Sequence, residues 1–323
     1  MKLMREQQVA FDGIMASKHS RTLGGYAGTG KTTVIQAIAK ECKILALAPT
    51  GKACQVLREK GIPAQTIHSL IYNSRFDGKR FINTEANYTV DADMIVVDEA
   101  SMVSEKFYNL LNKGYKVLYV GDHGQLPPVH TAFDLMKDPH YTLTEVHRQA
   151  KGNPIIALSK SIREGDRIIG DWSQRLENID CHICFDNRTR VNINKNIRRG
   201  RLSMLEAGEK VMFLENIKKT FNGEVVTVNK IGSETPDTID FDGYRVVKDT
   251  FGQCQRAVNH KRKGIMADYG YAMTCHKSQG SEFDSVGVYL TSTGARILGG
   301  NLNKWLYTAV TRAKKHLYLE VEL

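Results

Sequence analysis

A glycine-rich segment near the start of the sequence, residues 25–32, has the spacing of a phosphate-binding loop. It reads GYAGTGKT, so that glycines precede Lys31 and Thr32. Glycines let successive backbone N–H groups curl around phosphate oxygens at a helix N-terminus, where the lysine reaches the β and γ phosphates and the threonine hydroxyl binds Mg²⁺. The spacing therefore predicts a nucleoside triphosphate site with Mg²⁺. The expected nucleotide contacts also include Gly28, Thr29, Gly30 and Thr33.

Two acidic residues, Asp98 and Glu99, follow the apolar run of residues 94–97. A buried strand would deliver them to the ligand-binding edge of an α/β sheet. There we expect Asp98 to bind Mg²⁺ and Glu99 to orient or deprotonate the attacking water. Phosphoryl transfer also needs positive charge on the transferring oxygens, and composition alone does not choose among the arginines of the chain.

The elements that would position these residues follow from the apolar pattern, which alternates between β-rich runs and helical spacing up to about residue 148. Apolar residues 34, 35 and 38 recur at helical spacing directly after the glycine loop and predict a helix over 31–42. Continuous β-rich runs separated by helices indicate a buried parallel sheet. Its expected strands are residues 21–23, 44–48, 94–97 and 116–120.

Two further β-rich regions interrupt this pattern. An Asp77-Gly78 turn between aromatic and basic residues predicts an inserted hairpin. Short β-rich pieces between residues 208 and 255, punctuated by Asn222-Gly223 and Asp242-Gly243, predict a small antiparallel barrel. Buried strands of one interrupted domain are expected around it at residues 181–185, 285–290 and 317–321.

Length and composition indicate the number of domains and the kind of binding partner. The 323 residues exceed a typical single core, so two main domains are expected. A net charge of +10 favours a polyanionic partner such as nucleic acid, with a merely solvated basic surface as the alternative. The same alternatives apply to the basic segment 195–201, which we interpret as a solvated face.

The sequence has no apolar run long enough for a membrane span and no signal-like start. We therefore expect a cytoplasmic protein, in the host cytoplasm if a phage encodes it, without a membrane partner. Cys181 and Cys184 have ligand-like spacing, but no second pair follows at a zinc-site distance. Reduced core cysteines are the preferred interpretation.

The remaining motifs resemble those of superfamily 1B helicases, with the RecD-like and Dda-like branch the most similar. They fall in family order across nearly the whole chain. The segments that resemble motifs II, III, IV, V and VI are IVVDEASM (95–102), VGDHGQLPPV (120–129), LTEVHRQ (143–149), YAMTCHKSQGSEF (271–283) and LYTAVTRA (306–313).

The resemblance implies roles at an ATP site. Gln7 would read adenine, with its neighbour Gln8 as the alternative register. Gln125 would sense the γ-phosphate, and Arg148 and Arg312 would reach it from the second domain. Glu282 would contact the ribose.

The resemblance also implies contacts with a single nucleic-acid strand. The residues concerned are Pro49, Thr50 and Lys52 of motif Ia, His68 and Ser69 of motif Ib, and Thr274, His276 and Ser278 of motif V. Helix caps at Thr50 and Ser69, and ordinary buried histidines at positions 68 and 276, are the alternatives. Phe76 and Phe81 of the hairpin are the candidate strand-separating pin, the alternative being a surface hairpin.

The predicted architecture is an α/β protein with two RecA-like parallel-sheet motor domains. Residues 1–72 and 91–150 would form domain 1A, and 73–90 the hairpin insertion 1B. Residues 151–203 and 256–323 would form domain 2A, and 204–255 an SH3-like barrel 2B.

The predicted function is that of a monomeric, ATP- and Mg²⁺-dependent DNA helicase that moves 5′→3′ on single-stranded DNA and separates forked duplex DNA. Replication or recombination proteins are the expected protein partners. A superfamily 1 RNA helicase, an ATP-gated strand-binding or remodelling protein without processive unwinding, and a small-molecule kinase are the alternatives. The kinase would not need Gln125, the paired arginines or motif V.

Overall fold

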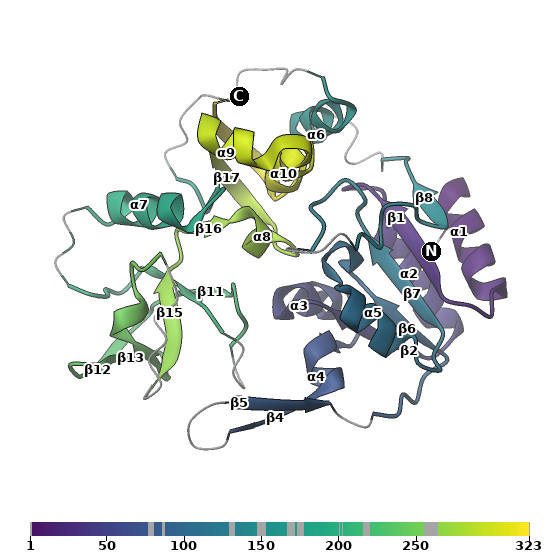
Figure 1. Ribbon diagram of the computed structural model, residues 1–323, viewed down its shortest axis with the longest axis horizontal. Coiled ribbons are helices and arrows are strands. Elements are labelled where there is room, and N and C mark those ends of the chain that lie inside the picture. The colour runs from purple at the N-terminus through teal and green to yellow at the C-terminus, as the bar shows by residue number, and fades with distance from the viewer. Residues whose placement is uncertain are drawn as a thin grey trace. The chain divides into compact units, whose positions relative to one another are not determined.

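The backbone of the computed structural model divides into two compact units (Figure 1). The structure describes residues 2–76, 81–85, 88–128, 133–146, 153–166, 172, 178–199, 201, 203–215, 220–254 and 264–322. The first unit comprises Met1–Arg75, Ile82–Ile169 and Asn303–Thr311. The second comprises Phe76–Phe81, Gly170–Leu302 and Arg312–Leu323.

A parallel sheet, called here the first sheet, forms the centre of the first unit. Its strand order is β3-β2-β6-β7-β1-β8. The strands predicted from apolar runs are present, and β1 continues to Gly25, where the glycine loop begins. The bounds are β1 (Arg21–Gly25), β2 (Ile44–Ala48), β3 (Ala64–Thr66), β6 (Met94–Val97), β7 (Val117–Gly121) and β8 (Tyr141–Leu143).

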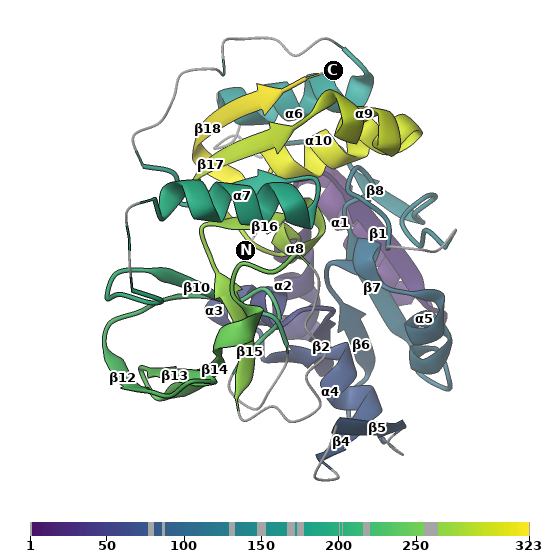
Figure 2. The same cartoon turned by 60° about the vertical axis from the view of Figure 1, so that its left-hand side comes forward.

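Helices cover both faces of the first sheet (Figures 1 and 2). Because side chains alternate along a strand, Val96 of β6 packs in one apolar cluster and Val97 in the other. The first cluster includes residues of α1 (Arg5–Ala16), α2 (Lys31–Glu41) and α3 (Gly51–Glu59), and the second includes α4 (Ile67–Ile71) and α5 (Glu105–Leu111). Burial on two faces explains why these strands are continuously apolar.

The predicted hairpin is present as the pair β4 (Tyr72–Phe76) and β5 (Phe81–Glu85). Its turn, residues 77–80, lies outside the described residues. Helices α6 (Pro154–Glu164) and most of α10 (Leu302–Val310) group with the first unit. The predicted domain boundary at residue 150 differs from this grouping, because side chains of α6 and α10 contact loops of the first unit, as described below.

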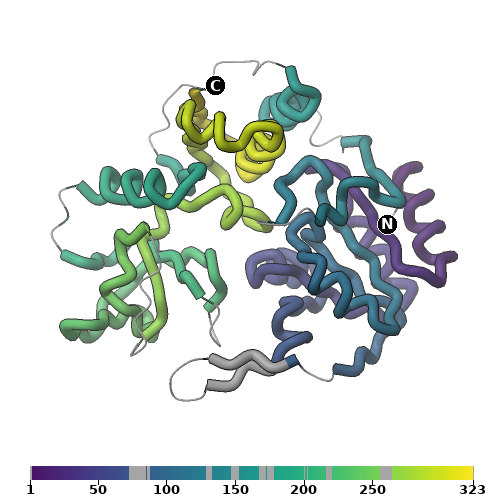
Figure 3. The backbone as a smooth tube through the Cα atoms, viewed as in Figure 1, coloured from purple at the N-terminus to yellow at the C-terminus, as the bar shows by residue number. Residues whose placement is uncertain are grey.

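The second unit contains a second parallel sheet with the order β16-β9-β17-β18. The strands expected at residues 181–185, 285–290 and 317–321 belong to it. Figure 3 lets the reader follow the backbone between them. The bounds are β9 (Cys181–Cys184), α7 (Asn187–Ile197), β16 (Ala272–Thr274), α8 (Cys275–Ser278), β17 (Phe283–Leu290), α9 (Ser292–Leu298) and β18 (Ala313–Val321).

A mixed sheet with the order β11-β10-β15-β14-β13-β12 completes the second unit. Phe213, Phe241 and Val246 lie in its buried cluster. Strand β15 lies between β10 and β14, so the sheet extends past the predicted end of the barrel at residue 255. The bounds are β10 (Lys210–Phe213), β11 (Val225–Thr227), β12 (Ile231–Glu234), β13 (Thr238–Phe241), β14 (Tyr244–Val247) and β15 (Ile265–Tyr269).

The cysteines are free, and most are buried. Burial raises the pKa of the Cys54 thiol to about 11 and that of Cys184 to about 12, so both stay protonated near neutral pH. Cys181 and Cys184 are buried, as predicted, whereas Cys254 is exposed. None of the described helices has the length and apolar character needed to cross a membrane.

Candidate functional site

The glycine loop joins β1 to α2 and encloses the ammonium group of Lys31. Gly28 and Gly30 have φ angles of 78° and 80°, in the left-handed region that favours glycine. A Cβ on Gly25 would come within 2.7 Å of Thr29 Oγ1, so the loop closes tightly on itself. Lys31 Nζ donates to the carbonyls of Gly25 and Tyr26 at 2.7 and 3.1 Å. This geometry is a cradle of backbone groups around a cation at a helix N-terminus.

Gln7 contacts this loop, whereas Gln8 does not. Gln7 is 2% exposed, and its Nε2 donates to the carbonyl of Thr29 at 3.0 Å. Its Oε1 accepts from the backbone N–H of Met4 at 3.0 Å. Gln8 instead donates to Asp12 at the exposed side of α1. The geometry therefore favours Gln7 as the register that faces the nucleotide loop.

Asp98 and Glu99 lie directly after β6. Desolvation raises the pKa of the Asp98 carboxyl, opposed by the Glu99 backbone N–H and by the charges of Lys31 and Lys60. Glu99 has a φ of 52°, which is uncommon for a residue other than glycine and costs about 1 kcal/mol or more. Thr32 Oγ1 accepts from Lys60 Nζ at 3.2 Å. Lys60 was missed from the sequence because no motif contains it.

In the loop after β7, the carboxylate of Asp122 binds the side chain of Gln125. Asp122 accepts from the backbone N–H of Gly124 at 2.9 Å and from Gln125 Nε2 at 3.5 Å. Gln125 is 5% exposed, and its Oε1 has no hydrogen-bond partner among the described residues, nor has the buried Nδ1 of His123. Such groups are suited to meet a ligand, because a buried polar atom without a partner is costly.

Residues of α10 contact both loops. Tyr307 donates through its hydroxyl to Asp122 at 2.7 Å and accepts there from the backbone N–H of Ala27 at 2.9 Å. The next residue, Thr308, accepts from the backbone N–H of Leu126 at 3.0 Å. The sequence placed both residues in motif VI but gave neither a role.

A cavity of about 570 Å³ lies beside the glycine loop. It is lined by Tyr26 and Ala27 of the loop, by Thr144 and Val146, and by residues of α6. The Tyr26 ring lies between Arg163 of α6, whose Cζ is 3.3 Å from the ring centroid, and His123, whose centroid is 4.1 Å away. The volume suits a small molecule. No residue predicted for the site lines this cavity within the described part of the chain.

Two of the remaining predicted nucleotide residues, Glu282 and Arg312, belong to the second unit. Arg312 is 4% exposed, and its Nη1 donates to the carbonyl of Ser281 at 3.2 Å. Glu282 follows Ser281 and is exposed. Thr33 lies in the first turn of α2 in the first unit, where its N–H donates to the carbonyl of Gly30 at 2.9 Å. Arg148 lies outside the described residues.

The predicted motif Ia and Ib residues lie at the beginnings of α3 and α4. Thr50 Oγ1 caps α3 by accepting from Ala53 N–H at 3.2 Å. Thr66, not Ser69, caps α4, so the alternative of a cap at Ser69 is wrong. The ring of His68 packs against Phe107 at 4.7 Å, and desolvation lowers its pKa. Pro49 and Lys52 are half-buried.

The motif V residues lie where β16 passes directly into α8, with Thr274 at the end of the strand and His276 and Ser278 in the helix. Thr274 precedes α8, and Ser278 is fully buried with its hydroxyl donating to the carbonyl of Cys275 at 2.7 Å. His276 is half-buried between them. Phe76 ends β4 and Phe81 begins β5, but their side chains lie outside the described residues.

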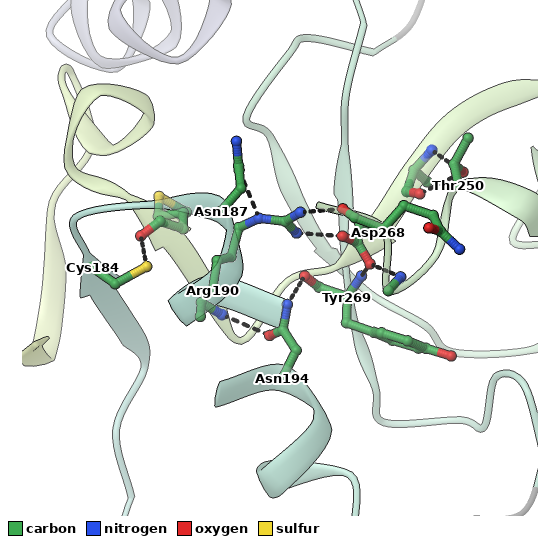
Figure 4. A network of polar contacts seen from close by, with 12 residues as sticks. Cys184, Asn187, Arg190, Asn194, Thr250, Asp268 and Tyr269 are labelled. Atoms are coloured by element: carbon green, nitrogen blue, oxygen red, sulfur yellow. Dashed lines mark hydrogen bonds and ion pairs between the residues drawn. The ribbon is translucent and has the colours of Figure 1, made fainter. Parts of the chain in front are cut away.

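Helix α7 is fixed to the mixed sheet by buried polar groups (Figure 4). Arg190 of α7 forms an ion pair with the fully buried Asp268 of β15. Asn194 donates to the carbonyl of Tyr269 and accepts from the N–H of Ala272, both at 3.0 Å. The helix therefore contacts both sheets of the second unit.

The basic segment at the end of α7 is not simply a solvated face. Arg198 and Arg201 bind Glu209, which is 1% exposed, at 2.5 and 2.8 Å. Burial alone would raise the pKa of Glu209, but hydrogen bonds from the two arginines lower it. These arginines were interpreted wrongly because Glu209 is not part of the same basic segment.

Comparison with known proteins shows which family the chain belongs to. A model described as "AAA domain" matches residues 2–182, which is more than half of the chain. The chain belongs to the AAA-domain family. In this AAA-domain protein a second model, "UvrD-like helicase C-terminal domain", matches residues 269–319. The first match contains the glycine loop and the second contains motif VI.

The AAA-domain protein is similar to the ATP-dependent RecD2 DNA helicase of Deinococcus radiodurans, with 30% identity over 373 residues. The alignment covers 98% of this chain and 49% of the relative, so the chain spans about half the length of that protein.

Solved structures share the fold. A structure of Pif1 helicases at forked DNA is 20% identical, with a TM-score of 0.68 and coverage of 99% of this chain and 92% of that one. A structure of Bacteroides Pif1 bound to single-stranded DNA is 19% identical, with a TM-score of 0.64, and the match covers 99% of this chain and 92% of that one. These likenesses confirm the α/β fold with parallel-sheet motor domains. The two family models and the RecD2 relative support the predicted membership of superfamily 1B helicases.

Proposed function

We propose that this AAA-domain protein is an ATP-dependent DNA helicase that travels 5′→3′ on single-stranded DNA and separates duplex strands. One observation supports this proposal above all. Strands β6, β7 and β1 are neighbours in the first sheet, and each ends in a loop that carries one ATPase motif. Asp98 and Glu99 follow β6, Gln125 follows β7, and Lys31 follows β1. Parallel strands end at one edge, which therefore collects these groups.

The residues at this edge fit Mg²⁺ and ATP. The glycine loop leads into the N-terminus of α2, where backbone N–H groups would bind phosphate oxygens beside Lys31. Thr32 and Asp98 offer hydroxyl and carboxylate oxygens, the ligand type that Mg²⁺ prefers, and the raised pKa of Asp98 indicates a carboxylate that a bound cation would stabilise. Bound Mg²⁺ would neutralise charge on the phosphate oxygens.

The protein groups then have distinct tasks. Lys31 binds the β and γ phosphates, and Glu99 orients the attacking water and takes its proton. Gln125 holds the γ-phosphate, while Arg148 and Arg312 stabilise the charge that develops on it. Gln7 and Glu282 bind the adenine and the ribose, and Gly28, Thr29, Gly30 and Thr33 complete the nucleotide contacts.

The strand-binding groups are proposed from the same motifs. Thr50, at the N-terminus of α3, and Lys52 would bind a phosphate of the strand, with Pro49 shaping the turn. His68, Ser69, Thr274 and His276 would add further backbone contacts. Ser278 is buried, so its part would be to hold the motif V turn. Phe76 and Phe81 remain the proposed pin.

We further propose the architecture expected from the motifs. Residues 1–72 with 91–150, and 151–203 with 256–323, would be the motor domains, with 73–90 as the hairpin insertion. The mixed sheet would correspond to the SH3-like barrel, enlarged by β15. The protein would work in the cytoplasm as a monomer, on single-stranded and forked DNA, with replication or recombination proteins as partners.

Unwinding of duplexes that carry only a 5′ or only a 3′ single-stranded tail tests the proposal. We expect separation of the 5′-tailed substrate with ATP and Mg²⁺. Glu99→Gln should bind ATP but not hydrolyse it or unwind, because only the water-activating carboxylate is neutralised. Preference for the 3′ tail would contradict the proposed polarity, and unchanged hydrolysis by Glu99→Gln would remove Glu99 from its role.

Two further outcomes separate the alternatives. DNA-stimulated hydrolysis without strand separation would indicate an ATP-gated binding protein. Stimulation by single-stranded RNA and not by DNA would indicate an RNA helicase, whose contacts would include the 2′-hydroxyl.

A further inference from the structure

The hydroxyl group of Tyr307 joins three segments that lie far apart in the sequence. It accepts a hydrogen bond from the backbone N–H of Ala27, in the glycine loop, at 2.9 Å. It donates to Asp122 Oδ2, in the loop after β7, at 2.7 Å. Tyr307 itself belongs to α10 and is 1% exposed. Both the donor and the acceptor capacity of this hydroxyl are therefore used inside the protein.

Asp122 carries the connection on to Gln125. Its Oδ1 accepts from the N–H of Gly124 at 2.9 Å, and its Oδ2 receives both the Tyr307 hydroxyl and Gln125 Nε2, the latter at 3.5 Å. Asp122 is 1% exposed, so this carboxylate depends on protein donors for its solvation. The Tyr307 hydroxyl and the Gln125 amide are therefore bound to the same carboxylate oxygen.

Packing around the ring prevents Tyr307 from moving away. A Cβ on Gly124 would come within 2.9 Å of Tyr307 Cε1, so the ring lies directly on the backbone of the loop. Thr308 binds the N–H of Leu126 in the same loop at 3.0 Å. Lys304, one turn earlier, forms an ion pair with Asp134 at 3.1 Å. The helix is thus held to the chain between β7 and β8 at three positions, Lys304, Tyr307 and Thr308.

We infer that Tyr307 is a positioning residue for ATP hydrolysis, which aligns Gln125 and the glycine loop with each other through its hydroxyl. The inference rests on the proposed function. A buried phenol suits this task because its ring has few rotamers and its hydroxyl can bind a donor and an acceptor at once. Without the hydroxyl the Ala27 N–H and Asp122 Oδ2 each lose a partner, and the loops are no longer tied to each other.

Tyr307→Phe tests the inference because it removes one oxygen and keeps the ring. In DNA-stimulated hydrolysis we expect kcat to fall between about 10- and 100-fold, because small misplacement of a catalytic group has large effects on rate. The KM for ATP should stay within about threefold, since Lys31 and the glycine cradle are intact. In a Gln125→Ala background, Tyr307→Phe should have little further effect on kcat, because Tyr307 acts on hydrolysis through Gln125.

Tyr119→Phe is the matched control. Tyr119 lies on β7 in the same unit, is 1% exposed, and its hydroxyl accepts from Asn112 Nδ2 at 2.7 Å. Loss of that hydroxyl should lower the melting temperature to a similar degree and leave kcat unchanged. If Tyr119→Phe and Tyr307→Phe have the same kcat, the Tyr307 hydroxyl contributes only to stability and the inference is wrong.

A binding measurement keeps this inference separate from the proposed function. Tyr307→Phe should weaken binding of ADP with aluminium fluoride and Mg²⁺ by about tenfold or more, and leave binding of ADP unchanged. Equal loss for both ligands, or loss for neither, would overturn the positioning role. Wild-type protein that binds both ligands but never unwinds DNA would contradict the helicase proposal and leave this result intact.

Discussion

Arg190→Met should destabilise the second unit far more than a comparable change at the surface. Asp268 is fully buried, and its Oδ1 accepts from the backbone N–H groups of Gly252 and Tyr269, both at 2.8 Å. Its Oδ2 is bound by Arg190, whose other terminal nitrogen donates to the Gln253 carbonyl at 2.9 Å. Methionine fills much of the volume of arginine but leaves a buried carboxylate oxygen without its counter-charge.

The expected loss is about 3–5 kcal/mol in the free energy of unfolding, the usual effect of removing one partner of a buried pair. With a urea dependence of about 2–3 kcal/mol per M, this corresponds to a midpoint lower by about 1–2.5 M. Arg245→Met is the control. Arg245 forms a two-pronged ion pair with Asp240 at 2.8 and 2.9 Å in the same sheet, but its side chain is 58% exposed. The urea midpoint of Arg245→Met should therefore stay close to that of the wild-type protein.

Urea unfolding followed by circular dichroism measures both midpoints. The double variant Arg190→Met, Asp268→Leu should regain most of the lost stability, because it removes the uncompensated charge as well. Equal midpoints for Arg190→Met and Arg245→Met would refute the reasoning. So would a double variant no more stable than Arg190→Met, since the loss would then come from packing and not from the charge.

Two further predictions concern the pH dependence of stability and the packing of the Tyr307 ring. Burial, with the charge of Lys210, lowers the pKa of His182 to about 4, whereas the unfolded chain protonates it near 6.5. Folding therefore excludes a proton between these values, so stability should fall as pH decreases from about 6.5 to 4, by up to about 3 kcal/mol. Melting temperatures of His182→Gln should depend less on pH over this range, and equal slopes would contradict the assignment. Gly124→Ala should displace the Tyr307 ring, which a new Cβ would approach to 2.9 Å, and should lower the kcat of hydrolysis; an unchanged kcat would show that the loop yields freely.

The sequence was sufficient to predict the four central strands of the first sheet, β2, β6, β7 and β1, because they are buried on both faces, whereas the short strands β3 and β8 were not predicted. Such strands read as continuous apolar runs, and the helices between them keep their own period. The glycine loop was equally predictable, since its φ angles require glycine at positions 28 and 30. Three strands of the second parallel sheet, β9, β17 and β18, followed from the same pattern, whereas β16 was not predicted. Local patterns of this kind depend only on neighbouring residues, so they are visible without a structure.

Contacts between distant segments were not predictable in the same way. Arg163 binds the face of Tyr26, and Glu209 binds Arg198 and Arg201, but no periodicity relates these residues. The extent of the mixed sheet was missed for a similar reason, because β15 pairs with β10 and β14 from beyond the last turn signal. Each of these contacts depends on the tertiary fold, which brings together residues that are far apart in the sequence.

Motif VI illustrates the difference between recognising a motif and knowing what it does. The resemblance gave a role to Arg312 alone, yet the chain enters the first unit at Asn303 and leaves it after Thr311. Within that passage Tyr307 binds the glycine loop and Asp122. Arg312, directly after it, binds the Ser281 carbonyl of motif V in the second unit. One short segment thus carries both the hydroxyl that we propose as a positioning group and an arginine that binds a carbonyl of motif V.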